Sequence, residues 1–239
     1  MNHSIVTLMF YANHDSSRYT GGVIEPGLRE RKKVRTRELI AETARTLFAE
    51  RGFEAVTVAE IARAADVSQQ TVFNYFPTKE DLVFWRLEAF EAELLGAIRD
   101  RPEGEPVIAA FGRFVRRPRG LLAEQDAAAR ERLAGITRTI AESPALLARE
   151  RETLARYTAS LAALIADEQG AGPAEIAPTV AANALMGVHH ALVAKARAGL
   201  LAGTPHAALA RRLGEEADRA LELLERGLSG YAVRRPGGG

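Results

Sequence analysis

Apolar residues recur every three or four positions along most of this chain, which is the spacing of one face of an α-helix. No alternating pattern typical of a β-strand persists long enough to compete with it. Glycines and prolines divide the pattern into about nine segments, so we expect an all-α protein. The first helix is predicted over residues 28–51, with the apolar positions Val34, Leu39, Ile40, Ala44, Leu47 and Phe48.

The next residues contain clear signals for a helix end and a helix start. Gly52 suits the left-handed position after a helix, and Phe53 suits the apolar contact that accompanies it. Thr57 and Glu60 match a T-x-x-E capping box, in which each side chain bonds the other residue's backbone N–H. A short second helix is therefore predicted to run to about Ala65.

A second turn and a third short helix follow at once. Asp66 tolerates a left-handed turn, and Ser68 is a good N-cap. The third helix is predicted over residues 69–75, because the residue before Pro77 disfavours helical geometry.

Two short helices joined by a three-residue turn and braced by another helix are the helix–turn–helix arrangement. The same signals also fit ordinary short helices in a bundle, where the caps serve only folding. The surface of the third helix favours DNA binding, because it carries hydrogen-bonding groups with little charge that suit base edges in a major groove. These residues are Gln69, Gln70, Thr71 and Asn74.

The remaining chain is also predicted to be helical. Thr78 and Asp81 cap a fourth helix that extends to about residue 100. Proline and glycine breaks then fall at residues 102–106, 117–120, 143–144, 170–173 and 203–205. The last two helices, at about 173–200 and 205–229, carry sustained apolar stripes.

Composition narrows the class of protein. The 239 residues include no cysteine, which excludes disulfides, thiol nucleophiles and cysteine-ligated metals. No apolar run approaches the roughly 20 residues that span a bilayer, and no charged segment precedes the short apolar run near the start. We therefore expect a cytoplasmic protein without a membrane segment.

Charge is unevenly distributed along the chain. Although the net charge is +1, residues 28–79 hold ten basic and seven acidic residues, a surplus of three positive charges. A basic run opens this segment, consisting of Arg29, Arg31, Lys32, Lys33, Arg35 and Arg37. It fits a segment that lies along nucleic acid and equally a solvated helix start.

The stretch from Glu38 to Leu82, which contains LFAERGFEAVTVAEIARAADVSQQTVFNYFPTKEDL, resembles the DNA-binding domain of TetR-family transcriptional regulators. The matching features are Gly52-Phe53, Thr57, Ile61-Ala62, Val67-Ser68, Tyr75-Phe76 and Lys79. The resemblance implies a homodimer whose third helices enter successive major grooves of a palindromic operator in double-stranded DNA. Asp66 and Phe73 depart from the family, which usually has glycine and tyrosine at these positions.

The resemblance also assigns roles to single residues. Gln69, Gln70, Thr71 and Asn74 would face bases, while Thr57, Tyr75 and Lys79 would contact phosphate, and Ser68 belongs to the same interface. Thr57 stands at a helix start, where backbone N–H groups favour an anion. The Phe73 ring suits a sugar or a thymine methyl but lacks the phenol hydroxyl that would bond a phosphate.

For the second half, the resemblance implies a small-molecule effector pocket and pairing of the last two helices across the dimer. The effector is expected to be lipophilic. The candidate wall residues are Phe90, Phe111, Phe114, Ile136, Tyr157, Asn183, Met186 and His189. Each of these also fits plain core. We expect no metal site, because the neighbouring His189 and His190 point about 100° apart on a helix.

The expected organisation has four parts. Residues 1–27 form a disordered arm or follow a start codon placed too far upstream, and residues 231–239 form a flexible tail. Residues 28–77 form the helix–turn–helix domain, and residues 78–230 form the effector-binding and dimerisation domain.

The expected function is that of a sequence-specific regulator, a repressor released from its operator by an effector. Two alternatives remain at this point: a DNA-binding protein without effector control, and an α-helical small-molecule enzyme. No dinucleotide-binding, P-loop, zincin or nucleophile-elbow motif supports an enzyme, and no cofactor is expected.

Overall fold

The computed structural model describes residues 28–85, 87–116 and 127–228, and these ranges contain helices and no β-strand. The predicted all-α class is confirmed. In chain order the helices are α1 (Leu28–Arg51), α2 (Val58–Ala64), α3 (Gln69–Tyr75), α4 (Asp81–Phe84), α5 (Leu87–Arg99), α6 (Val107–Arg116), α7 (Ala127–Glu142), α8 (Pro144–Gln169), α9 (Ala177–Leu201) and α10 (His206–Leu228). The predicted arm (1–27) and tail (231–239) lie outside the described residues.

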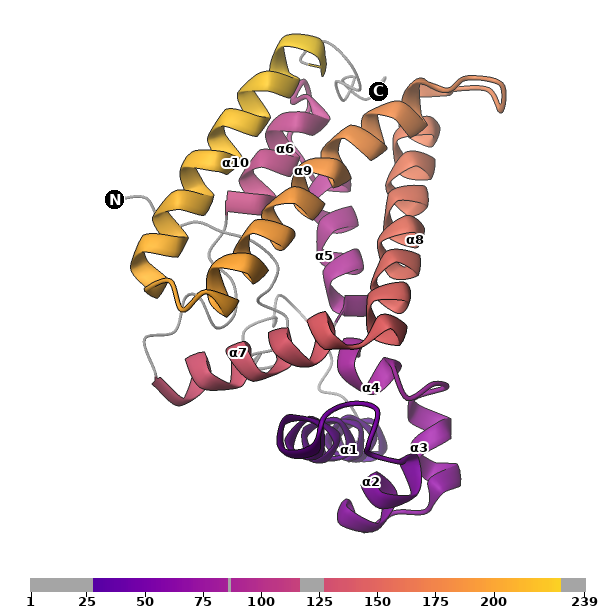
Figure 1. The fold of residues 1–239 in the computed structure, drawn as a ribbon. Coiled ribbons are helices and arrows are strands. Elements are labelled where there is room, and N and C mark those ends of the chain that lie inside the picture. The colour runs from indigo at the N-terminus through magenta and orange to yellow at the C-terminus, as the bar shows by residue number, and fades with distance from the viewer. Residues whose placement is uncertain (1–27, 86, 117–126, 229–239) are drawn as a thin grey trace.

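The helices form two groups of different size (Figure 1). Helices α1 to α4 gather at one end of the molecule, and α7 lies crosswise between α1 and the larger group. In that larger group α8 packs on α5 and α9, while α10 packs on α9 and α6. This arrangement places the helix–turn–helix at one end, where α3 is open to a large partner.

The predicted fourth helix is divided in two, which is why the described residues hold ten helices rather than about nine. The two pieces, α4 and α5, pack on different neighbours, since α4 lies against α1 and α5 lies against α6 and α8. Between them, Trp85 keeps helical dihedral angles and its ring lies 5.9 Å from the guanidinium of Arg37 in α1. The chain therefore changes packing partner at this point.

The apolar face of α1 is narrower than its sequence suggests. Ile40, Ala44 and Phe48 are buried at intervals of four residues, as predicted. Val34 and Leu39 are 44% and 51% exposed, so their expected place in the core is wrong. Leu39 lies one position off the buried face, and Val34 belongs to the exposed first half of the helix.

The last two helices pack closely on each other within the chain. The apolar residues of α10 that are buried in this way are Leu209, Leu213, Ala217 and Leu221. A Cβ placed on Gly199 of α9 would lie 2.5 Å from Leu209 Cδ1, so a larger residue here would force the Leu209 side chain to shift. Much of the α10 stripe is therefore used inside one subunit.

Candidate nucleic-acid interface

The start of α2 is fixed by a complete capping box. The Thr57 N–H donates to Glu60 Oε2 at 2.8 Å, and the Glu60 N–H donates to Thr57 Oγ1 at 3.3 Å. The bonds from the Thr57 backbone and hydroxyl, followed by the nearby Arg51 guanidinium, lower the pKa of Glu60 to about 2. The Thr57 hydroxyl thus holds α2 in place at the site where the sequence predicts a phosphate contact.

The turn between α2 and α3 has the predicted geometry. Asp66 adopts a left-handed φ of 53°, and the Ser68 hydroxyl accepts the Thr71 N–H at 3.0 Å. The Ser68 and Thr71 hydroxyls also bond each other at 2.8 Å. Both hydroxyls therefore stabilise the start of α3, and this role explains the two residues without any contact to DNA.

The outward face of α3 is polar and uncharged. Gln69, Gln70 and Asn74 are exposed, whereas Val72 points into the core and is 1% exposed. Gln70 Nε2 donates to Asn74 Oδ1 at 3.0 Å, so the two amides form one unit one helical turn long. Neither a basic nor an acidic residue occurs in α3. This face therefore offers hydrogen-bonding groups but no charge, so any charge near it lies on neighbouring elements.

Aromatic residues flank these amides. Phe73 is 43% exposed on the same helix, which is unusual for so large an apolar ring. Tyr75, the last residue of α3, is half-buried and packs against the core. Phe73 therefore exposes much of its ring, whereas Tyr75 contributes to packing.

Lys79 lies in the turn between α3 and α4, over an aromatic pair. Its Nζ is 4.2 Å from the centre of the Phe53 ring and 5.9 Å from that of Phe48. Burial lowers the pKa of the Lys79 ammonium, and the negative charges of Glu54 and other nearby carboxylates partly offset this. Cation–π contact holds the side chain in one place, as a phosphate-binding lysine requires.

The basic run at the start of α1 separates into two kinds of residue. Among its basic residues, Arg29, Arg31, Lys32, Lys33 and Arg35 are exposed. Arg37 is half-buried, with its guanidinium 5.5 Å from the centre of the Phe76 ring. The first group can approach a phosphate backbone, while Arg37 joins α1 to the end of α3.

Helix α8 connects the helix–turn–helix to the rest of the protein. The Ser143 hydroxyl, which caps α8, donates to Glu54 Oε1 at 2.7 Å. Arg149 donates to Asp81 Oδ1 through Nε at 3.1 Å and through a terminal nitrogen at 2.7 Å. The other oxygen of Asp81 accepts the Thr78 N–H at 3.0 Å, as the predicted cap requires. One carboxylate therefore ties α8 to the turn that carries Lys79.

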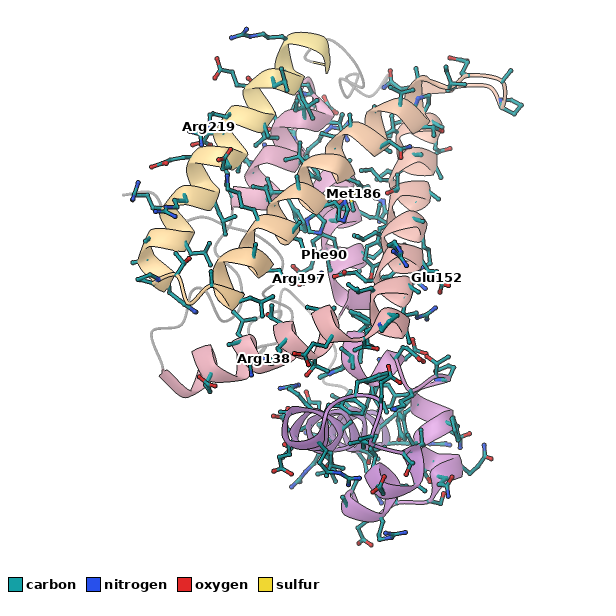
Figure 2. All side chains as sticks on the ribbon, in the orientation of Figure 1. Phe90, Arg138, Glu152, Met186, Arg197 and Arg219 are labelled. Atoms are coloured by element: carbon teal, nitrogen blue, oxygen red, sulfur yellow. The ribbon has the colours of Figure 1, made fainter. Side chains whose placement is uncertain are left out.

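Seven of the eight candidate effector residues are buried in the larger group of helices. The Phe90 ring centre lies 4.9 Å from that of His189, 5.3 Å from that of Phe114 and 5.8 Å from that of Tyr157. Figure 2 labels Phe90 and Met186 among these helices. Phe111, Ile136 and Met186 are also buried. Asn183 is exposed and donates to the Thr179 carbonyl oxygen at 2.8 Å, so it lies outside this cluster.

Sequence reasoning missed three ion pairs that hold this region together. Arg101 is 1% exposed and binds both carboxylate oxygens of Glu168, at 3.0 and 2.6 Å. Arg197 binds both oxygens of Glu150, at 3.1 and 2.6 Å. The third is the Arg149 pair described above. No local spacing marks such partners, because they are distant in sequence.

Metal sites and membrane-spanning helices are both missing from the part of the chain that the structure describes. Within residues 28–85, 87–116 and 127–228, no group of three or more histidine, aspartate or glutamate side chains is placed to hold a metal ion. None of the helices in the same ranges is both long and apolar enough to cross a membrane.

Comparison with known proteins gives sequence matches that each cover only part of this chain. TcmR, a transcriptional regulator from Streptomyces glaucescens, is 40% identical over 90 residues, which cover 37% of this chain and 40% of TcmR. The transcriptional repressor KstR2 from Rhodococcus jostii (strain RHA1) is 41% identical over 69 residues, or 29% of this chain and 33% of KstR2. The chain thus matches well under half the length of either relative.

A solved structure, that of Salmonella enterica GusR, aligns with 84% of this chain and 98% of its own at 22% identity, with a TM-score of 0.44. The similarity to a known family comes from the sequence. The family model for bacterial regulatory proteins of the tetR family matches residues 40–84, which run from the buried half of α1 to the end of α4. This segment, with its capped turns, exposed α3 and Lys79, is therefore similar to the tetR family of bacterial regulatory proteins.

Proposed function

We propose that this protein is a sequence-specific DNA-binding transcriptional regulator that represses from a palindromic operator. The observation that carries the proposal is the face of α3, whose amide groups and Phe73 ring are exposed. Base edges in a major groove are matched by such groups, and Lys79 with the basic start of α1 supplies charge for the phosphates. Residues 28–77 would form the DNA-binding domain, and residues 78–230 the regulatory domain, of a cytoplasmic protein.

Selection of genomic DNA fragments by the purified protein tests this directly. We expect a palindrome to be enriched and to bind at least a thousandfold more tightly than a scrambled sequence. Equal binding to both would instead support a DNA-binding protein without sequence preference. Gln70→Ala should lower affinity for the operator and leave affinity for scrambled DNA unchanged, since Gln70 is exposed and not needed for folding.

We propose that the active form is a homodimer joined through α9 and α10. Exposed small residues recur along α9 every three or four positions, at Gly187, Ala191, Ala194 and Ala198, and Val180 on this helix is 56% exposed. A Cβ on Gly187 would meet no atom of the same chain within 4 Å, so a second subunit has room to approach.

A charged side chain in this stripe tests the dimer. Gly187→Arg should shift sedimentation from dimer to monomer. It should also weaken operator binding, because each monomer then binds a single half-site without the linked second subunit. Ala163→Arg is the matched control, since Ala163 is an exposed small residue on α8. A dimeric Gly187→Arg protein would place the interface elsewhere.

We propose that a lipophilic small molecule binds among the aromatic side chains around Phe90 and releases the operator. Tyr157 of this cluster belongs to α8, the same helix whose first turns bind Glu54 and Asp81 beside Lys79. A ligand that favours one position of α8 therefore also favours one position of the DNA-binding helices.

A screen of lipophilic compounds against the labelled protein–operator complex tests the effector proposal. We expect a releasing compound whose half-maximal concentration changes in Tyr157→Phe while operator affinity without compound does not. Trp85, the only tryptophan, lies between α4 and α5 and reports the accompanying movement by fluorescence. Release that is identical in Tyr157→Phe would place the ligand away from this cluster.

A further inference from the structure

Gln70 and Asn74, two of the three exposed amide side chains of α3, together leave a defined set of outward hydrogen-bonding groups. The bond between Gln70 Nε2 and Asn74 Oδ1 uses one donor and one acceptor. A carbonyl oxygen on one residue and an amide nitrogen with two hydrogens on the other then face outward. Exchanging oxygen and nitrogen on both amides leaves the same set of outward groups in either orientation.

This set matches one base better than the others. In the major groove adenine presents a donor at N6 beside an acceptor at N7, which pair with a carbonyl oxygen and an amide N–H. Guanine presents two acceptors, O6 and N7, so it leaves the amide carbonyl without a donor. Arginine and lysine make the commonest contact with guanine, and α3 contains neither.

Phe73 adds an apolar contact on the same side of the helix. It lies three residues after Gln70 and one before Asn74, and 43% of it is exposed. The thymine methyl is the apolar group that bases present in the major groove. The hydroxyls of Ser68 and Thr71 bond each other at 2.8 Å, so the amides and this ring dominate what α3 offers.

We propose that α3 reads A·T base pairs in each half-site, with Gln70 and Asn74 acting as one unit on an adenine edge and Phe73 covering a thymine methyl of the same or the next pair. The inference rests on the proposed function, because it specifies what the DNA-binding surface recognises. It assigns a specificity role to Phe73, where the sequence departs from the family.

Base analogues in the selected operator test both contacts without changing the protein. Replacing one thymine per half-site with deoxyuridine removes only the methyl group. At the position under Phe73 we expect about a fourfold loss of affinity per half-site, from ~0.8 kcal/mol per buried CH2. Replacing the contacted adenine with 7-deazaadenine removes the N7 acceptor and should cost about fivefold or more.

Protein variants assign each effect to a side chain. The deoxyuridine effect should vanish in Phe73→Ala and persist in Phe73→Tyr, which keeps the ring. The 7-deazaadenine effect should vanish when the residue that presents the outward NH2 is changed, which is Asn74→Ala in the orientation described and Gln70→Ala if both amides are exchanged. These positions are exposed, so these variants should fold, and their circular dichroism confirms it.

The inference is overturned if neither analogue weakens binding at any position of an operator that the wild type prefers, or if the pairs required beneath α3 are G·C. Such results leave the proposed function intact, since a preferred operator still exists. Failure to enrich any sequence is a different outcome, which removes the proposed function and this inference with it.

Discussion

Lys79 is the residue whose charge we expect to contribute most clearly to phosphate binding. Its ammonium lies 4.2 Å from the centre of the Phe53 ring, so its position is fixed before DNA arrives. The informative perturbation is Lys79→Met, because methionine keeps an apolar stem over that ring and removes only the charge. Lys79→Ala would also lose the packing, and Lys79→Arg keeps the charge.

The magnitude follows from counterion release. One phosphate contact contributes about 0.9 to the slope of log affinity against log salt concentration, so two subunits lose about 1.8. Between 50 and 200 mM salt the wild type should therefore lose about tenfold more affinity than Lys79→Met. The cation–π contact contributes only about 0.5–1 kcal/mol to folding, so the variant should stay folded at 25 °C.

Fluorescence anisotropy titrations at several salt concentrations measure this slope. The loss should be equal for operator and scrambled DNA, because phosphates carry no sequence information. Lys79→Arg should retain the wild-type slope. If Lys79→Met has the wild-type slope instead, Lys79 makes no phosphate contact and its role is confined to packing on Phe53.

Three further predictions concern stability. The pKa of Glu60 is lowered to about 2 in the folded protein, from 4.5 when unfolded, so its ionised form stabilises the fold fully above pH 4.5 and this stabilisation is lost as pH falls toward 2. Urea unfolding at several pH values should therefore show a smaller loss of stability across this range for Glu60→Gln than for the wild type. Arg101→Ala leaves a carboxylate without its buried partner and should lower the free energy of unfolding by about 3 kcal/mol, and a change below 1 kcal/mol would contradict that role. Gly199→Ala should destabilise by about 1–3 kcal/mol, because the new Cβ would displace the Leu209 side chain, whereas Gly135→Ala, which meets no neighbouring atom, should not. Equal melting temperatures would show that the Leu209 side chain moves aside without loss of packing.

The local signals in the sequence predict the helix–turn–helix closely. The bounds of α1 and α3 agree with prediction, because caps and turns depend on residues only a few positions apart. Ser68 caps α3 through a bond to Thr71, and Asp66 takes the left-handed conformation expected of it. Such interactions can be read from spacing alone.

Features that depend on distant residues could not be predicted in this way. The Arg149–Asp81 and Arg101–Glu168 pairs join positions more than sixty residues apart, and no local pattern connects them. The exposure of Asn183 was missed because its helix has apolar residues on more than one face. Packing decides which of these faces the core covers.

We claim that α3 reads base sequence as part of a dimer, and one experiment separates this from binding to phosphates alone. Genomic fragments selected by the purified protein are titrated by anisotropy across salt, beside a scrambled control of the same length. We predict that a palindrome is enriched and keeps its preference over the control at every salt concentration, while both affinities fall. Uniform weak binding that disappears as salt rises would contradict the claim, because it would reflect phosphate contacts alone.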